Sequence, residues 1–277
     1  MPMLQTKSGF VKVDNGQLYY ETGGEGTPFV MIHAGVADSR QWNNEFAAFA
    51  STHGVLRYDM RGYGQSEPAE GEFSHLNDLT GLLDALEIRE PFVLMGCSMG
   101  GELAMDFAVS QPWRVKALIM VGSAPSGLEL DIPPLAKFAD AERAWHAGDL
   151  DLLTEIETQI WFDGAGRRPE QVNQDMRRLL YEMNYKALRN ERSGLGKRLP
   201  NAMTPAVERL SELSMPILVI VGEHDTPYIL AAADYMQEHL LSAEKVVIAD
   251  AAHLPNMDHP EEFQAIVRKF LQQHSAR

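Results

Sequence analysis

The chain has 277 residues, which is enough for one large α/β domain or for a core domain that carries an insertion. Apolar residues make up 45% and charged residues 23%, a globular balance that excludes wholesale disorder. The net charge of −15 makes nucleic acid and an anionic membrane surface poor partners, because an acidic surface repels phosphate groups.

The sequence also bears on location. Apolar runs such as 217–221 are far shorter than a membrane span, and the first ten residues have neither the basic nor the apolar part of a signal peptide. The single cysteine, Cys97, cannot form an internal disulfide. We therefore expect a cytoplasmic protein without a membrane partner. No feature of the sequence predicts the oligomeric state.

Strand signals recur along the chain. Residues 9–13 and 17–21 flank Asn15-Gly16, which suits a tight turn with positive φ, so we expect a β-hairpin first. Short apolar runs then predict buried strands at 29–32, 55–58, 92–95, 116–121, 217–221 and 246–248. Helical periodicity lies between or after these runs, for example at 76–86 and 260–271. This alternation predicts an α/β fold with a mostly parallel sheet covered on both faces.

Residues 128–210 depart from this alternation. They contain no convincing strand and carry three amphipathic helical patterns, at 138–145, 150–161 and 172–183. We therefore expect a core formed by residues 1–127 and 211–277, with a helical cap at 128–210 inserted between two core strands. The many Met and aromatic residues of this stretch, Trp161 among them, are expected to serve mainly in packing.

The stretch GCSMG at 96–100 matches the pattern G-x-S-x-G. It follows an apolar strand and precedes an amphipathic helix, which is the setting of a nucleophile elbow. A sharp turn there would expose the Ser98 hydroxyl beyond the sheet, and the glycines would remove Cβ atoms that collide. Ser98 is therefore the candidate nucleophile, whereas Cys97 is expected to face the interior and to be inert.

A serine nucleophile needs a base, and the base needs a carboxylate that orients it. Both should lie where late strands end, at the same edge of the sheet. Asp225 follows the strand at 217–221 and His253 follows the strand at 246–248, so these two are the candidates. Glu223 and Asp250 are the alternative acids. His33, at the end of an early strand, is expected to be structural and to bind the neighbouring loops.

These motifs together resemble the α/β-hydrolase superfamily over nearly the whole chain. The matching stretches are HAG at 33–35, DMRGYGQS at 59–66, GCSMGG at 96–101, GEHD at 222–225 and HLP at 253–255. The resemblance implies an eight-stranded, mostly parallel sheet with a helical cap after the sixth strand, and it assigns the catalytic roles to Ser98, Asp225 and His253. It also implies an oxyanion hole formed by the backbone N–H groups of Met99 and Gly35, with Val36 as the alternative to Gly35.

Two departures from the family pattern affect the expected substrate. Many relatives have His-Gly where this chain has His33-Ala34, and many have a histidine where it has Cys97. Both positions lie near the acyl-binding end of the expected pocket.

The reaction that the resemblance implies is acyl transfer to water, with no metal and no organic cofactor. The sequence contains neither H-x-x-x-H nor H-E-x-x-H, and its Asp and His residues lack ligand spacing. The loop at 59–66 is expected to be scaffolding, with Arg61 paired to Asp59.

The first choice of function is a carboxylesterase for small to medium esters. Serine at position 98 weighs against the related dehalogenases and epoxide hydrolases, which use aspartate. A lactonase of the 3-oxoadipate enol-lactonase kind is the alternative; its anionic substrate would need local arginines, for which Arg143 and Arg189 are the candidates. Carbon–carbon bond hydrolases and perhydrolases share the same framework. A non-catalytic small-molecule binding protein that reuses the fold is the alternative from a different class.

Overall fold

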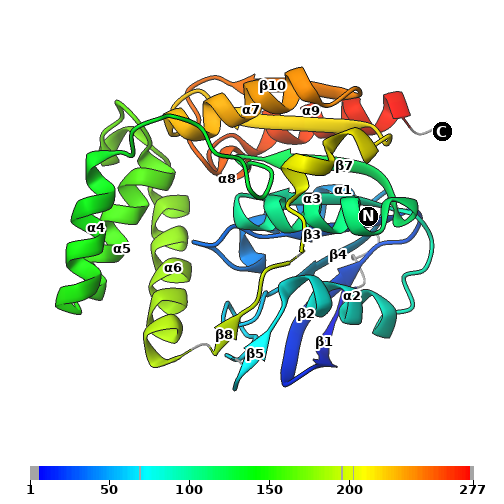
Figure 1. The fold of residues 1–277 in the computed structure, drawn as a ribbon, viewed down its shortest axis with the longest axis horizontal. Helices are drawn as coiled ribbons and strands as arrows, with labels where there is room; N and C mark the ends of the chain where they lie inside the picture. Colours follow the sequence, from blue (N-terminus) through cyan, green and yellow to red (C-terminus); the bar gives the residue numbers. More distant parts are fainter. Residues whose placement is uncertain (1–5, 69, 195, 202, 275–277) are drawn as a thin grey trace.

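The computed structural model describes residues 6–68, 70–194, 196–201 and 203–274. Its main sheet has eight strands in the order β1-β2-β4-β3-β6-β7-β9-β10 (Figure 1). Pairing is antiparallel between β1 and β2 and between β2 and β4, and parallel elsewhere. The predicted eight-stranded, mostly parallel sheet is thus confirmed. The strands are β1 (Thr6–Val13), β2 (Gly16–Gly23), β3 (Pro28–Ile32), β4 (Gly54–Tyr58), β6 (Phe92–Cys97), β7 (Val115–Val121), β9 (Ile217–Gly222) and β10 (Ala243–Ile248).

The predicted hairpin is formed by β1 and β2. Val13 pairs with Gly16, which leaves Asp14 and Asn15 as the two turn residues. Asn15 has φ 58°, a left-handed conformation that asparagine tolerates better than most residues.

Helices cover both faces of the sheet because its buried strands are apolar on both sides. In β3, Val30 and Ile32 face one side and pack with α2 (His75–Ala85), α3 (Met99–Ser110) and α7 (Pro227–His239). Phe29 and Met31 face the other side and pack with α1 (Asn43–Phe49) and α9 (Pro260–His274). Pro260 begins α9 as predicted, and Phe263, Val267 and Phe270 form its buried face.

Three further helices lie between β7 and β9: α4 (Ala136–Ala147), α5 (Leu150–Thr158) and α6 (Gln174–Gly194). They correspond to the three predicted amphipathic patterns. They pack on one another in sequence and gather on one side of the molecule, away from the helices that cover the sheet (Figure 1). Among the described residues, no helix combines the length and the apolar character needed to cross a membrane.

The prediction that residues 128–210 contain no strand is wrong in one detail. Lys197 and Arg198 form the short strand β8 (Lys197–Arg198), which pairs in parallel with β5 (Glu72–Phe73). Two-residue strands have no periodicity, so neither could be predicted from its own sequence. The remaining short helices are η1 (Ser39–Trp42), η2 (Pro112–Arg114), η4 (Pro169–Gln171), η5 (Ala206–Glu212), α8 (Pro255–Asp258) and the π-helical turn η3 (Gln159–Asp163).

Candidate active site

Ser98 lies in the turn between β6 and α3 with φ 53° and ψ −120°, a conformation that a side chain normally disfavours. A Cβ atom at Gly96 would collide with the carbonyl oxygen of Gly100, and one at Gly100 would collide with that of His33. The glycines two residues on either side of Ser98 are therefore required by close backbone packing, which confirms the reason inferred from the sequence.

Hydrogen bonds hold the backbone of Ser98 in this conformation. Its N–H donates to the carbonyl of Val121 at 2.9 Å, and its own carbonyl accepts from the Ser123 hydroxyl at 2.7 Å. The N–H groups of Gly101 and Glu102 also donate to the Ser98 carbonyl, both at 2.9 Å. The strain at Ser98 is thus maintained by its surroundings and not by one contact alone.

His253 and Asp225 lie together where β10 and β9 end. The imidazole Nδ1 of His253 is 2.9 Å from each carboxylate oxygen of Asp225, and the two residues are 1% and 2% exposed. The carboxylate also accepts from the backbone N–H of Thr226 at 2.7 Å. Because a carboxylate accepts hydrogen bonds, this contact places a proton on Nδ1 and leaves Nε2 as the acceptor of the neutral ring.

The alternative acids contact other groups. Glu223 accepts from the backbone N–H of Asp250 at 3.1 Å, and Asp250 lies 3.4 Å from the ring of His224. Neither carboxylate has a hydrogen bond or ion pair with His253 among the described residues. Of the three candidates, the structure brings only Asp225 to the histidine.

Ser98 and His253 both lie beside the segment 121–122. A Cβ atom at Gly122 would lie 3.1 Å from His253 Nδ1, while Val121 binds the Ser98 backbone. The two side chains are not hydrogen-bonded to each other: the buried Nε2 of His253 has no hydrogen-bond partner within the described chain. A gap of this kind is common in unliganded hydrolases, where catalytic hydrogen bonds tighten only with substrate.

Trp161 covers His253, a contact that the sequence did not reveal. The two ring centroids are 4.4 Å apart, and the backbone N–H of His253 donates to the Trp161 carbonyl at 3.2 Å. Trp161 belongs to η3, the π-helical turn after α5. We expected Trp161 to serve mainly in packing, and its contact with the candidate base was not foreseen.

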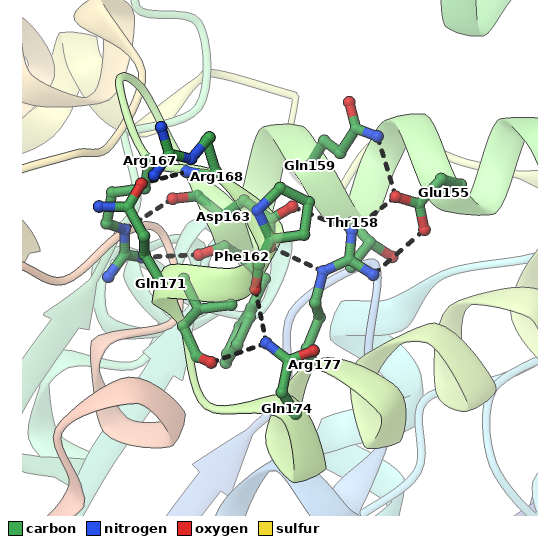
Figure 2. A network of polar contacts seen from close by, with 12 residues as sticks. Glu155, Thr158, Gln159, Phe162, Asp163, Arg167, Arg168, Gln171, Gln174 and Arg177 are labelled. Atoms are coloured by element: carbon green, nitrogen blue, oxygen red, sulfur yellow. Dashed lines mark hydrogen bonds and ion pairs between the residues drawn. The ribbon is translucent and has the colours of Figure 1, made fainter.

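Two arginines hold η3 in place (Figure 2). Arg177 binds both carboxylate oxygens of Asp163 at 2.9 Å and one oxygen of Glu155 at 2.6 Å. Arg167 donates to the carbonyls of Phe162 and Asp163, both at 2.7 Å. These contacts fix the turn that carries Trp161.

Gly35 and Met99 lie next to each other at the predicted oxyanion hole. A Cβ atom at Gly35 would be 3.6 Å from the Cβ of Met99, in ordinary contact. Met99 begins α3, so its N–H has no carbonyl one turn earlier. Neither N–H donates to an acceptor among the described residues. Both remain available for an oxygen atom of a ligand, and so does the N–H of Val36, the alternative, which has no acceptor among the described residues either.

His33 is structural, as predicted. Its Nδ1 is 2.8 Å from the Ala34 carbonyl and its Nε2 accepts from the Met60 N–H at 2.9 Å. Burial lowers the pKa of His33, so the ring is neutral and can both donate and accept. His33 thereby ties the loop at 33–36 to the loop at 59–66.

The pairing expected for Arg61 is wrong. Its guanidinium binds Asp78 of α2 at 2.5 and 2.8 Å, whereas Asp59 accepts from the backbone N–H groups of Ser39 and Gln65. Asp59 therefore satisfies the backbone of two loops, a demand that is invisible in the sequence. The loop still serves as scaffolding.

Cys97 is fully buried, and burial raises the pKa of its thiol to about 12. Its Sγ is 3.8 Å from the His253 carbonyl. A thiol that stays protonated is a poor nucleophile, which agrees with the expectation that Cys97 is inert.

A cavity of about 390 Å³ opens beside Ser98. Its lining includes Ser98, Met99, Ser123, Leu128 and Tyr228. Within the described ranges, no three His, Cys, Asp or Glu side chains are arranged to hold a metal ion.

Known proteins similar to this chain agree with the fold. A family model described as the alpha/beta hydrolase fold matches residues 27–260. The pimeloyl-[acyl-carrier protein] methyl ester esterase of Aeromonas hydrophila is 28% identical over 253 residues, 91% of this chain and 98% of that protein. The 3-oxoadipate enol-lactonase 1 of Acinetobacter baylyi is 28% identical over 252 residues, 90% of each chain. An esterase from Thermogutta terrifontis superposes with a TM-score of 0.76 at 24% identity, over 98% of this chain and 99% of its own. The chain belongs to the α/β-hydrolase fold family, a family of hydrolases and esterases.

Proposed function

We propose that the protein is a serine hydrolase of small to medium carboxylic esters. The observation that carries the proposal is the strained turn at Ser98 next to the buried pair of His253 and Asp225. A positive φ at a residue other than glycine costs energy, and such strain persists mostly where function needs it.

In the proposed reaction, the Ser98 hydroxyl oxygen forms a bond to the ester carbonyl carbon while His253 Nε2 takes its proton. Asp225 holds the imidazole orientation and stabilises the imidazolium. The tetrahedral intermediate then collapses: its bond to the alcohol oxygen breaks, and Nε2–H protonates that oxygen. The oxygen of a water molecule then bonds to the acyl carbon while the same nitrogen takes its proton. The bond between that carbon and Ser98 Oγ breaks, Nε2–H protonates Oγ, and the acid leaves.

The proposed oxyanion hole uses the N–H groups of Gly35 and Met99. Their proximity and their lack of other acceptors in the described chain support this assignment. Fixed backbone donors need no reorganisation when charge develops, which is why such groups lower the barrier strongly.

Residues 128–210 are proposed to form the cap over this site, between the core parts 1–127 and 211–277. The contact of Trp161 with His253 supports the assignment, because it brings the helical segment to the candidate base. Nothing in this reaction calls for a cofactor, and the protein is proposed to act in the cytoplasm on a small-molecule substrate.

A lactonase is the second candidate function. The similarity to an enol-lactonase over 90% of both chains favours it. The chemistry at Ser98 would be the same, except that the alcohol released by ring opening stays attached to the acyl group.

A fluorophosphonate probe tests the proposal directly. Such probes form a covalent bond only with an activated serine, so wild-type protein should be labelled at Ser98 and the Ser98→Ala variant should not. A panel of p-nitrophenyl esters and lactones would then separate esterase from lactonase. Failure of both labelling and turnover would instead favour a non-catalytic binding protein.

A further inference from the structure

Met99, the residue after Ser98, lines two of three cavities in this region. Besides the cavity at Ser98, one of about 370 Å³ is lined by Met99, His75 and Arg198, and one of about 540 Å³ is lined by Glu102 and Arg198. Each pair of these cavities shares a lining side chain. The cavity at Ser98 shares Met99 with the cavity of about 370 Å³ and Glu102 with the cavity of about 540 Å³, and the last two share Arg198. The three cavities therefore adjoin one another beside Ser98, and together they are called the crevice below.

Arg198 is the cation of this crevice, and it lacks a strong acceptor. Its Nη1 lies 3.2 Å from the thioether sulfur of Met99, and its Nη2 is 3.6 Å from a carboxylate oxygen of Glu102, beyond hydrogen-bond distance. Among the described residues it donates to no oxygen atom, whereas Arg61 and Arg177 bind carboxylates directly. A guanidinium is built to bind two oxygen atoms side by side, so Arg198 has capacity for a ligand.

His75 supplies a second unsatisfied group in the same cavity. It is 3% exposed, and its buried Nδ1 has no hydrogen-bond partner within the described chain. Burial, together with the nearby Arg198, lowers the pKa of His75 to about 3, so the ring is neutral and keeps one N–H. An unpaired buried nitrogen is costly, so a ligand oxygen that reached this ring would gain a hydrogen bond from its N–H.

Acidic side chains also border the crevice. Glu102 lies between two of the cavities and Glu191 lines the one that contains His75. Burial raises the pKa of both carboxyl groups, which disfavours their charged forms. Arg61 borders the same cavity but is bound to Asp78. Asp106 also lines the cavity of about 540 Å³. Among the described residues, Arg198 is the cation of the crevice that has no carboxylate at hydrogen-bond distance.

We propose that this crevice binds an anionic group of the substrate, a carboxylate, with Arg198 as the main contact and His75 as the second donor. The inference rests on the proposed function at Ser98 and narrows its substrate to esters or lactones that carry a free carboxylate. The arginines expected for this role, Arg143 and Arg189, do not line the three cavities; Arg143 pairs with Asp140 on the exposed face of α4.

Three p-nitrophenyl esters of the same length test the charge preference: the glutarate monoester, the valerate and the 4-(trimethylammonio)butyrate ester. Their far ends are a carboxylate, a methyl group and a cation. We expect kcat/KM to fall in that order. A preference for the cationic ester would overturn the proposal and would assign Glu102 as the recognition group.

Variants test whether Arg198 causes the preference for the carboxylate ester. Arg198→Gln should lower the ratio of kcat/KM for glutarate to that for valerate by about tenfold, the effect of one charge-assisted hydrogen bond. Arg198→Lys should recover part of the ratio, and Glu102→Gln should raise it by removing the competing carboxylate. Arg143→Gln is the matched control and should keep the wild-type ratio. If Arg198→Gln also keeps that ratio, Arg198 does not bind the carboxylate.

A binding measurement separates this inference from the proposed reaction. Glutaramate and valeramide are amides that differ only in the terminal carboxylate, and their binding to the Ser98→Ala variant can be followed by calorimetry. We expect glutaramate to bind about tenfold more tightly, and the difference to vanish in Ser98→Ala/Arg198→Gln. Equal binding of the two amides would overturn the carboxylate site even if the wild-type protein hydrolyses esters. Tighter binding of glutaramate without any ester turnover would retain the site and overturn the proposed function.

Discussion

The backbone N–H of His253 donates to the carbonyl of Trp161, and the indole ring lies against the imidazole with 4.4 Å between centroids. Trp161 comes from the helical segment between β7 and β9, whereas His253 follows the last strand of the sheet. The position of the candidate base therefore depends on a turn outside the sheet, and on the arginines that hold this turn.

Arg167→Gln should destabilise the protein by about 3–5 kcal/mol, because it leaves a buried charge without its partner. Arg167 Nη2 lies 2.7 Å from Asp258 Oδ2, which is close enough for an ion pair although the two groups are not aligned for a hydrogen bond. The two side chains are only 5% and 6% exposed. Urea unfolding measures the change. The neighbouring Arg168, whose side chain is 79% exposed, provides the control, and Arg168→Gln should change stability by less than about 0.5 kcal/mol. Equal stability of the two variants would show that Arg167 does not hold the turn.

Ser98→Ala should reduce kcat for p-nitrophenyl esters by a factor on the order of 10⁶ while the protein stays folded. The expected loss of activity is large because alanine has no hydroxyl group that could attack the ester carbonyl. Ser110 lies at the far end of the same helix, and among the described residues its hydroxyl binds only the Phe107 carbonyl, so Ser110→Ala should keep wild-type turnover. Circular dichroism checks the fold of both variants. Substantial activity in Ser98→Ala would assign the nucleophile elsewhere.

Asp225→Asn should lower kcat by about 10⁴-fold, because an amide that donates to Nδ1 favours the wrong imidazole tautomer. The exposed Asp250 follows the adjacent strand and contacts His224 instead of His253. Asp250→Asn is thus the matched control and should retain most of the activity. Steady-state kinetics on one ester compares the two; a larger loss in Asp250→Asn would exchange their roles.

The sequence predicted those parts of the fold that depend on local signals. Apolar runs located the six strands of the parallel part of the sheet within a few residues, and five of them are buried on both faces and have few polar side chains. The expectation of a buried strand at 246–248 is wrong, because β10 lies at the edge of the sheet and Val247 is 47% exposed. The conformation of Ser98 was also predictable, because the motif places glycines around it; a Cβ at Gly96 would collide with nearby Gly100, whereas one at Gly100 would collide with the distant His33.

Contacts between distant segments could not be predicted in the same way. Nothing near Trp161 indicates that its ring meets His253, and nothing near Arg198 indicates that β8 pairs with β5 and carries the guanidinium to Met99. Arg61 was assigned to the nearest acid in sequence, Asp59, but a helix packed against its loop presents Asp78 instead. Side chains contact residues that are near in space. A single sequence without regular periodicity does not show which residues far apart in the chain are near each other in the fold.

The thiol of Cys97 should resist iodoacetamide in the native protein at pH 8. It is fully buried, and burial raises its pKa to about 12, so the reactive thiolate is scarce and inaccessible. Mass spectrometry after timed exposure measures the extent of labelling, and the same reagent in denaturant should label the thiol completely. Rapid labelling of the folded protein would show that Cys97 is reachable and would reopen its role beside Ser98.

Glu45 provides a test of stability against pH. Its carboxyl is buried under α9, where Asn256 and Gln264 donate to it, and burial raises its pKa from 4.5 to about 7. The folded state therefore binds the proton more tightly than the unfolded state does. The resulting stabilisation is complete below pH 4.5 and is lost as the pH rises through 7, by about 3 kcal/mol in all.

Glu45→Gln cannot titrate, so the difference in unfolding free energy between variant and wild type isolates this one group. We expect that difference to move in favour of the variant between pH 4.5 and 7 and to be constant outside this range, because all other titrating groups are shared. Denaturant unfolding at a series of pH values measures it. A difference that is constant across the whole range would mean that the Glu45 carboxyl has the same pKa folded and unfolded, and that water or a rearranged partner reaches it in the native protein.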